Sequence, residues 1–128
     1  MKIPLTSVMV DDQDKALAFY TEKLGFVKKT DIPMGEHRWL TVVSAEEPDG
    51  TQLVLEPMSF EPARDYQKAL HEAGIPLTAF QVDDVNREHG RLKGLGVEFS
   101  MEPTDMGPTR MAVLDDTCGN CIQIFQVG

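Results

Sequence analysis

A histidine, a tryptophan and a glutamate in the first half of the chain could act on a small molecule. His37 and Trp39 lie in the segment GEHRWL, and Glu56 ends the segment TQLVLE. An imidazole titrates near neutral pH, an indole offers a flat stacking face, and a carboxylate in a cavity can be a general base or a polar anchor. Each side chain also has a purely structural interpretation. His37 can be an exposed residue at the rim of a strand, Trp39 a core residue, and Glu56 a solvated carboxylate at the end of a strand. We carry Glu56 as the catalytic candidate, and His37 and Trp39 as ligand-binding candidates.

Two cysteines, Cys118 and Cys121, form a C-x-x-C pattern in TCGNC. Such a pair can be redox active or can supply half of a zinc site. A redox pair usually opens a helix, whereas this pair straddles a Gly-Asn turn that enters the strand-like segment CIQIF. No second C-x-x-C and no H-x-x-x-H completes a zinc site. The pattern favours one turn residue and one strand residue without chemistry.

Composition narrows the possible partners. The 128 residues suffice for one domain with a core, and their net charge is -9. Nucleic acids and anionic membranes attract clustered lysine and arginine, so the acidic balance argues against both as partners. No apolar run approaches the length of a membrane span, and the start of the chain leads directly into a strand pattern. We expect a cytoplasmic protein.

The chain contains an internal repeat. A shift of 72 positions aligns IPLTSVMVDD with IPLTAFQVDD, Met34-Gly35 with Met106-Gly107, and Arg38 with Arg110. A shift of 69 positions continues the match into the last strand-like segments. Matches that run in order along both halves predict two copies of one unit. We place module one at 1–57, a linking helix at 58–74 and module two at 75–128.

Each module is predicted to have the order β-α-β-β-β. An alternating strand runs into an Asp-Asp pair able to cap a helix, the helix ends at Gly25 or Gly96, and three strand-like segments follow. The fold class is therefore α+β, with two tandem modules whose curled mixed sheets enclose a cavity and carry their helices outside. Helical spacing predicts these buried stripes: Leu17, Tyr20 and Leu24 in the first helix, and Val85, His89, Leu92 and Leu95 in the second.

Comparison of the two copies predicts which face of each strand its helix covers. Val8 and Val10 match Phe80 and Val82, and four apolar residues favour the helix side. The alternate residues of these strands, which point to the other face, include both apolar and polar side chains. Such a mixture favours a surface that faces a ligand. Besides His37 and Trp39, the ligand-binding candidates are Leu5, Ser7, Gln52, Val54, Leu77, Ala79, Gln81 and Gln123. Arg38 and Arg110 occupy matched positions, which favours a structural salt bridge over substrate binding.

The segment VDDQDKALAFYTEKLGF resembles the V-x-D…FY…LGF signature of the vicinal oxygen chelate superfamily. That superfamily includes glyoxalase I, extradiol dioxygenases, and bleomycin and fosfomycin resistance proteins. The segment DDTCGNCIQI is similar to its D-P-x-G-N-x-x-E-L ending. The resemblance covers essentially the whole chain and implies the duplicated fold and a homodimer. It leaves the reaction open, because the superfamily hosts lyases, isomerases, dioxygenases and plain binders.

The resemblance also implies where a metal ion would be held. The four ligand positions of metal-dependent members correspond here to Leu5, Val54, Leu77 and Gln123. Divalent ions need several imidazole or carboxylate donors, and an aliphatic side chain has no lone pair to offer. We therefore expect no family metal site and no cofactor.

Three functions remain in competition. The first is a metal-independent small-molecule-binding protein of this family, which holds an organic ligand in the cavity between the two modules. The alternative is a metal-dependent enzyme, a glyoxalase-like lyase or an extradiol-type dioxygenase, with a displaced site around Glu56 and His37, joined by Gln123. In the third, side chains fill the cavity and the protein binds a partner.

Overall fold

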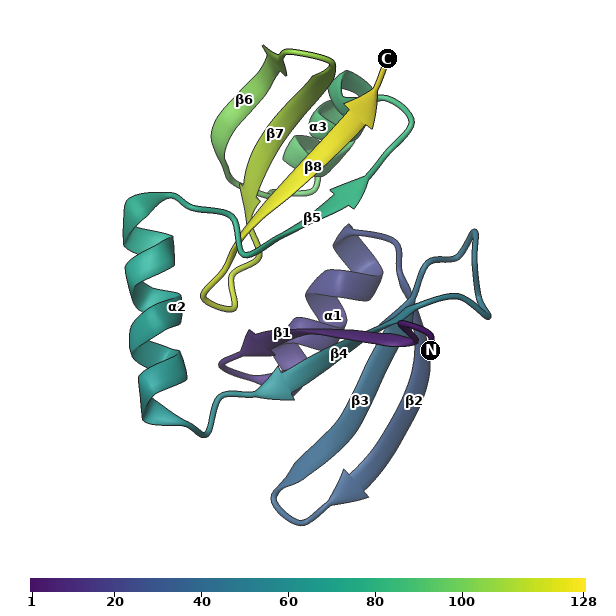
Figure 1. Ribbon diagram of the computed structural model, residues 1–128, viewed down its shortest axis with the longest axis vertical. Coiled ribbons are helices and arrows are strands. Elements are labelled where there is room, and N and C mark those ends of the chain that lie inside the picture. The colour runs from purple at the N-terminus through teal and green to yellow at the C-terminus, as the bar shows by residue number, and fades with distance from the viewer. The chain divides into compact units, whose positions relative to one another are not determined.

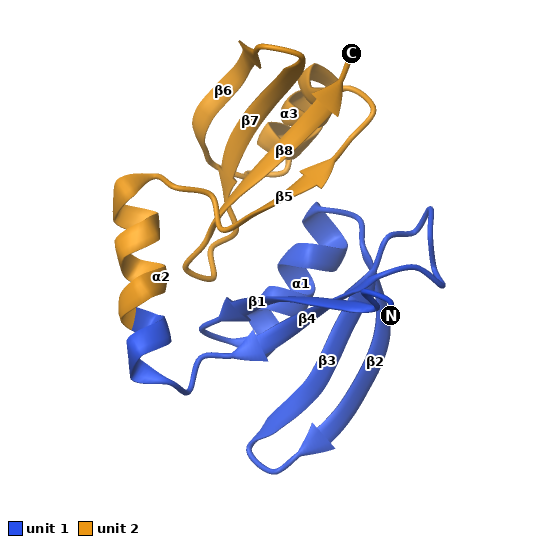
Figure 2. Ribbon diagram, viewed as in Figure 1, with its two compact units in different colours: residues 1–64 blue, residues 65–128 orange.

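The computed structural model describes residues 1–128 and divides them into two compact units, 1–64 and 65–128 (Figure 2). Unit 1 contains β1 (Leu5–Val10), α1 (Gln13–Ala18), a π-helical turn η1 (Phe19–Lys23), β2 (Val27–Met34), β3 (His37–Val43) and β4 (Gln52–Pro57). The linking helix α2 (Glu61–Ala73) crosses the boundary. Unit 2 contains β5 (Thr78–Gln81), α3 (Val85–Gly94), β6 (Phe99–Met106), β7 (Thr109–Asp115) and β8 (Cys121–Val127) (Figure 1). The predicted α+β class and the two β-α-β-β-β modules are confirmed.

The two modules have the same sheet topology. The strand order is β1-β4-β3-β2 in module one and β5-β8-β7-β6 in module two. The first strand of each module pairs in parallel with the last, and all other pairs are antiparallel, so both sheets are mixed. None of the helices combines the length and the apolar character needed to span a bilayer.

One face of each sheet packs under its own helix and forms the core. In module one Val8 is paired with Leu55, and Val42 with Leu53, so these side chains share a face. In module two Phe80 and Ala112 are both paired with Ile124 on the matching face. Each buried aliphatic side chain contributes roughly 1.5–3 kcal/mol to folding. The assignment of Val8, Val10, Phe80 and Val82 to the helix side agrees with this register.

The first helix differs from its prediction. Ala16, Phe19 and Tyr20 are buried, whereas Leu17 and Leu24 are only half-buried. The reason is that α1 passes into η1 at Phe19, and the wider π turn directs two consecutive aromatic side chains inward. The Phe19 and Tyr20 rings then meet edge to face, with their centroids 5.7 Å apart.

The second helix follows its prediction more closely. Val85 and Leu92 are fully buried, and the His89 ring packs edge-on against Phe99 with centroids 4.5 Å apart. His89 therefore lies on the helix side of the sheet, as the repeat predicts. Leu95 is exposed, because α3 ends at Gly94 and Leu95 is already its C-cap.

The turn between β7 and β8 is built around a buried carboxylate. Asp116 has no exposed surface, and its oxygens accept hydrogen bonds from the Cys118 N–H (2.7 Å), the Asn120 N–H (3.0 Å) and the Asn120 side-chain amide (2.8 Å). The side-chain amide of Gln67, on α2, donates to Asn120 Oδ1 at 2.9 Å. This amide lies so close to Gly119 that a Cβ added at Gly119 would be 2.7 Å from Gln67 Oε1. Gly119 also has a φ of +102°, so glycine is required there twice over.

The two cysteines lie in this turn and at the strand that follows it, and neither forms a disulfide. Cys118 is buried within the turn, and Cys121 begins β8. The interpretation of one turn residue and one strand residue is therefore confirmed. Burial raises the pKa of the Cys121 thiol, and the negative charges of Asp115 and Asp116 raise it further.

We expect both thiols to resist alkylation in the native protein. A raised pKa leaves Cys121 little thiolate near pH 7.5, and because both cysteines are buried, access to either sulfur requires the turn to open. Iodoacetamide should modify them on the order of a hundredfold more slowly in buffer than in denaturant, as followed by intact mass. Modification of Cys121 at similar rates in both conditions would contradict its burial.

Candidate functional site

The face of each sheet that lies away from its own helix is called here the open face. On module one the register places Leu5 beside Gln52, Ser7 beside Val54, and Met9 beside Glu56 on this face. Thr41 is paired with Val54, which brings the same parity of β3 onto it. The structure therefore gathers these predicted residues on one surface: Leu5, Ser7, Trp39, Gln52, Val54 and Glu56.

The polar groups of this open face are only partly satisfied. Thr41 Oγ1 donates to Gln52 Oε1 at 2.7 Å, which fixes the amide and leaves its NH2 group free to donate. Glu56 is half-buried, and its carboxylate takes part in no hydrogen bond or ion pair. Trp39 is half-buried, Leu5 and Ser7 are exposed, and Val54 is buried. The face offers an apolar floor, one amide donor and one free acceptor.

The open face of module two carries the remaining predicted residues. Ala79 is paired with Gln123, and Gln81 with Phe125. The side chains of Gln81 and Gln123 make no hydrogen bond, and Ala79 and Gln81 are exposed. Leu77 lies one residue before β5, where its N–H donates to the Cys121 carbonyl at 2.9 Å, and it is half-buried. The cavity shared by the two modules stays a prediction.

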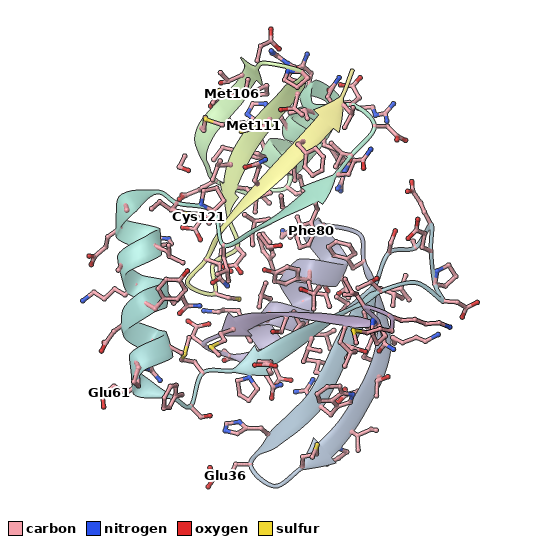
Figure 3. The ribbon with its side chains drawn as sticks, viewed as in Figure 1. Glu36, Glu61, Phe80, Met106, Met111 and Cys121 are labelled. Atoms are coloured by element: carbon pink, nitrogen blue, oxygen red, sulfur yellow. The ribbon has the colours of Figure 1, made fainter.

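His37 has the same parity on β3 as Trp39 and Thr41, and it also has neighbours that the sequence did not predict. It begins β3 and is exposed, and it lines a pocket of about 240 Å³ at the edge of module one. The residues around this pocket are Val10, Asp11, Asp12, Gln13, Asp14, Glu36, His37, Arg38, Pro57 and Met58. Glu56 is not among them. His37 thus shares a hollow with the acidic start of α1, and Glu36 marks its hairpin tip (Figure 3).

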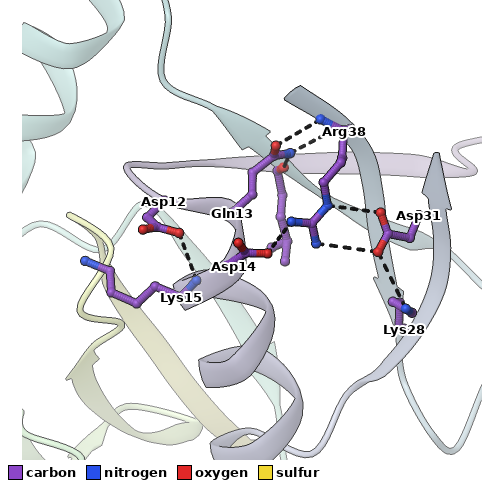
Figure 4. A network of polar contacts seen from close by, with 8 residues as sticks. Asp12, Gln13, Asp14, Lys15, Lys28, Asp31 and Arg38 are labelled. Carbon is purple, nitrogen blue, oxygen red and sulfur yellow. Dashed lines mark hydrogen bonds and ion pairs between the residues drawn. The ribbon is translucent and has the colours of Figure 1, made fainter. Parts of the chain in front are cut away.

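The matched arginines lie on the helix side of each sheet. Arg38 forms ion pairs with Asp14 of α1 and with Asp31 of β2 (3.0 Å), and Lys28 approaches Asp31 at 3.5 Å (Figure 4). In module two Arg110 donates to Asn86 of α3 at 3.1 Å and pairs with Asp105 at 2.8 Å. The expected salt bridges are therefore present at both arginines.

The electrostatics of this network follow from its contacts. Hydrogen bonding to Arg38 lowers the pKa of Asp31 below its ordinary 3.8, and the charges of Arg38 and Lys28 add to the effect. The carboxylates of Asp14 and Asp31 in turn raise the pKa of Arg38. A carboxyl group whose pKa is lower in the folded than in the unfolded protein stabilises the fold above its unfolded pKa, and that stability is lost as the pH falls through its folded pKa.

The substitution Arg38→Gln should raise the pKa of Asp31 toward 3.8, because the largest cause of its lowering is removed. The melting temperatures of the variant and the wild type should differ most near pH 6 and should converge as the pH falls through the lowered pKa of Asp31 in the wild type, below which Asp31 is protonated in both. A carboxyl NMR titration measures the pKa directly. Lys28→Gln is the matched control and should move it less. An unchanged Asp31 titration in Arg38→Gln would contradict the network.

The donors needed for a metal ion are not assembled. No group of three or more histidine, cysteine, aspartate or glutamate side chains is placed to hold one. The four positions that the resemblance identifies as metal ligands contribute Leu5, Val54, Leu77 and Gln123, which do not fit a divalent ion.

Sequence reasoning missed some residues of the open faces. Ile32 and Met34 of β2 are paired with Trp39 and His37 and so extend the open face of module one. Met106, at the matching hairpin of module two, is paired with Thr109. The repeated Met-Gly dipeptide was a usable signal, because it marks the same hairpin in both modules. The pocket beside His37 had no sequence signal, since residues from three separate segments form it.

Comparisons with known proteins are consistent with this architecture. A family model described as the Glyoxalase/Bleomycin resistance protein/Dioxygenase superfamily matches residues 2–124. The uncharacterized protein YurT of Bacillus subtilis (strain 168) is 56% identical over 98% of this chain and 99% of its own. The crystal structure of UcmS2 has a TM-score of 0.83 and 32% identity, over 98% of this chain and 97% of that one. The crystal structure of TnmS3, an antibiotic binding protein from Streptomyces sp. CB03234, has a TM-score of 0.79 and 30% identity, over 100% of this chain and 97% of that one.

Proposed function

Because the chain belongs to the glyoxalase/bleomycin resistance protein/dioxygenase superfamily, we propose that it binds a small organic molecule on its open faces without a metal ion. The observation that carries the proposal is the makeup of these faces. Apolar side chains such as Leu5 and Trp39 surround polar groups that have no partner within the protein. Sites for small molecules combine an apolar surface with a few such polar groups. The antibiotic-binding function of TnmS3 supports an antibiotic-like ligand.

Each polar group of the open faces can make a different kind of contact with a ligand. The amide NH2 of Gln52 is held by Thr41 and can donate to a ligand carbonyl or hydroxyl oxygen. The Glu56 carboxylate can accept from a ligand hydroxyl or pair with a ligand cation. Gln81, Gln123 and the Ser7 hydroxyl supply adaptable hydrogen bonds. If the ligand is also transformed, Glu56 is the general base, because it is the open-face carboxylate without a partner.

Metal independence rests on the donor set. Aliphatic side chains at Leu5, Val54 and Leu77 cannot replace the imidazole and carboxylate ligands of metal-dependent relatives. The alternative enzyme would join His37 to Glu56 and Gln123, which supplies one imidazole, one carboxylate and one amide, and no group of three or more histidine, cysteine, aspartate or glutamate side chains is placed to hold a metal ion. This donor set favours binding over metal-dependent lyase or dioxygenase chemistry.

A thermal-shift screen of metal-free protein tests the proposal, with a macrolide, a quinolone, an anthracycline and an aminoglycoside as probes. We expect at least one compound to raise the melting temperature after EDTA treatment and dialysis, because a ligand that binds only the folded state stabilises it. Glu56→Gln should weaken that compound's binding about tenfold, consistent with loss of a charge-assisted hydrogen bond. Glu46→Gln, at an exposed glutamate of the β3–β4 loop, is the control. Binding that appears only when Ni²⁺, Zn²⁺, Mn²⁺ or Fe²⁺ is restored would overturn metal independence.

We also propose that the protein is a homodimer, on the strength of the family resemblance. Small-angle scattering in dilute solution should then give twice the chain mass of 14.3 kDa. A scattering mass equal to that of one chain would refute it.

A further inference from the structure

The methionines of the sheets are all on the open faces. In module one Met9 is paired with Glu56 and Met34 with His37. In module two Met101 is paired with Val113, Met106 with Thr109, and Met111 with Phe125, and Figure 3 shows Met106 and Met111 on this sheet. The chain has seven methionines, and the other two, Met1 and Met58, lie outside the strands.

The helix-covered faces of the sheets carry no methionine. Their buried strand residues are valine, leucine, isoleucine and alanine, among them Val8, Leu40, Leu55, Leu114 and Ile122. These residues have few rotamers and specify a single packing arrangement, whereas methionine is unbranched and adapts to irregular shapes. The chain therefore fills its core with rigid aliphatic side chains and reserves the adaptable one for the open faces.

Packing inside a module does not account for the methionines of the hairpins. Met34 is 63% exposed and Met106 is 50% exposed, at matching positions next to glycines with the same φ of +64°. Two exposed apolar side chains at equivalent points of two modules leave apolar area in water at both points. Contact with a bound molecule would offset that cost.

The charge on the open faces also restricts the occupant. No lysine or arginine stands among the cross-strand pairs of either open face, whereas Glu56 and Asp115 do. The chain as a whole carries a net charge of -9. An anionic ligand would meet repulsion without a counter-charge, so a neutral or cationic molecule is favoured.

We propose that the five open-face methionines determine specificity, and that the ligand they select is a neutral or cationic planar aromatic molecule. This inference rests on the proposed function. A thioether sulfur near the edge of an aromatic ring contributes roughly two- to tenfold in affinity, and the flexible side chain follows rings of different outline. Trp39 and Phe125, which share these faces, supply the flat surfaces against which a ring can stack.

The test compares thioether with aliphatic side chains at constant size. The probes are proflavine, a planar cation, and 2-aminoanthraquinone, a neutral planar molecule. Their affinities are read from quenching of Trp39, which is the single tryptophan of the chain. A variant with leucine at Met9, Met34, Met101, Met106 and Met111 should bind both probes at least about tenfold more weakly, because several sulfur contacts are lost. Met58→Leu, off the open faces, should bind them as the wild type does.

A second measurement covers the case in which the fivefold variant does not fold. Wild-type sequence produced with norleucine keeps the unbranched shape and loses the sulfur, whereas selenomethionine keeps a polarizable atom. We expect norleucine protein to bind proflavine more weakly and selenomethionine protein to bind it normally. Equal proflavine affinity in all of these proteins would overturn the role of the methionines. Failure of the wild type to bind either planar probe would overturn the ligand class, while binding of another compound in the antibiotic screen would leave the proposed function standing.

Discussion

Replacing Asp116 by alanine is expected to destabilise the protein by about 3–5 kcal/mol, which is a large fraction of a small domain's stability. The carboxylate is fully buried and accepts hydrogen bonds from the Cys118 N–H, the Asn120 N–H and the Asn120 amide. Alanine removes the carboxylate acceptor of all three donors at a buried position. Asn120 would also lose the support that positions it for Gln67 of α2.

Urea unfolding measures this change, with Asp115→Ala as the neighbouring control. Asp115 is half-buried and accepts from the Thr117 N–H at 2.7 Å and from His71 at 3.0 Å, so water can replace much of what it provides. We expect the control to cost about 1 kcal/mol. An Asp116→Ala protein within 1 kcal/mol of the wild type would show that the buried carboxylate does not organise the turn.

Replacing Gln13 by alanine is expected to cost about 2–4 kcal/mol. Gln13 is only 9% exposed, and its amide joins α1 to two strands. The Nε2 group donates to the carbonyl oxygens of Arg38 (2.8 Å) and Leu55 (2.9 Å), and Oε1 accepts from the Arg38 N–H (3.0 Å). These backbone groups would be left unpaired in the substituted protein. The loss should appear as a lower midpoint in urea, with the slope of the transition unchanged.

Gln126→Ala in module two is the matched control for Gln13→Ala. Gln126 Oε1 accepts a single hydrogen bond, from the Val85 N–H at 2.6 Å, where α3 begins. One hydrogen bond predicts a loss of about 1 kcal/mol. If the two variants lose the same stability, then the number of hydrogen bonds does not set the strength of the helix attachment.

The duplicated fold and the two faces of each sheet could be predicted from the sequence. Period-2 alternation identifies two faces, and agreement between copies shows which face is apolar in both: Val8 and Val10 match Phe80 and Val82. The repeat also identified Arg38 and Arg110 as structural. Local patterns and repeated residues carry this information, so no long-range contact was needed.

The contacts of the candidate site could not be predicted in the same way. The Thr41–Gln52 hydrogen bond depends on the register of β3 against β4, which alternation does not determine. Gln13 resembles an ordinary solvated residue in a first helical turn, until two distant strands bring backbone groups to it. The π turn at Phe19 changes which side chains are buried without any glycine or proline to indicate it. The two hydrogen-bonding cases depend on contacts between separate segments, and the π turn is a local departure from helical spacing that the residue pattern does not indicate.

The glutamines that attach the two helices limit how parts of the two modules can be exchanged. In the alignment that shifts the chain by 72 positions, Gln13 is equivalent to Val85. The Val85 N–H donates a hydrogen bond to the side-chain oxygen of Gln126. Module one therefore anchors its helix with a side chain from the helix, and module two with a side chain from the sheet. The two equivalent modules therefore attach their equivalent helices through different side chains. A crossover that exchanged only the last strands would give one half both glutamines and the other half neither. Such an exchange would therefore cost the half without a glutamine the side-chain hydrogen bonds that attach its helix, whereas exchange of a helix together with its whole sheet would keep them.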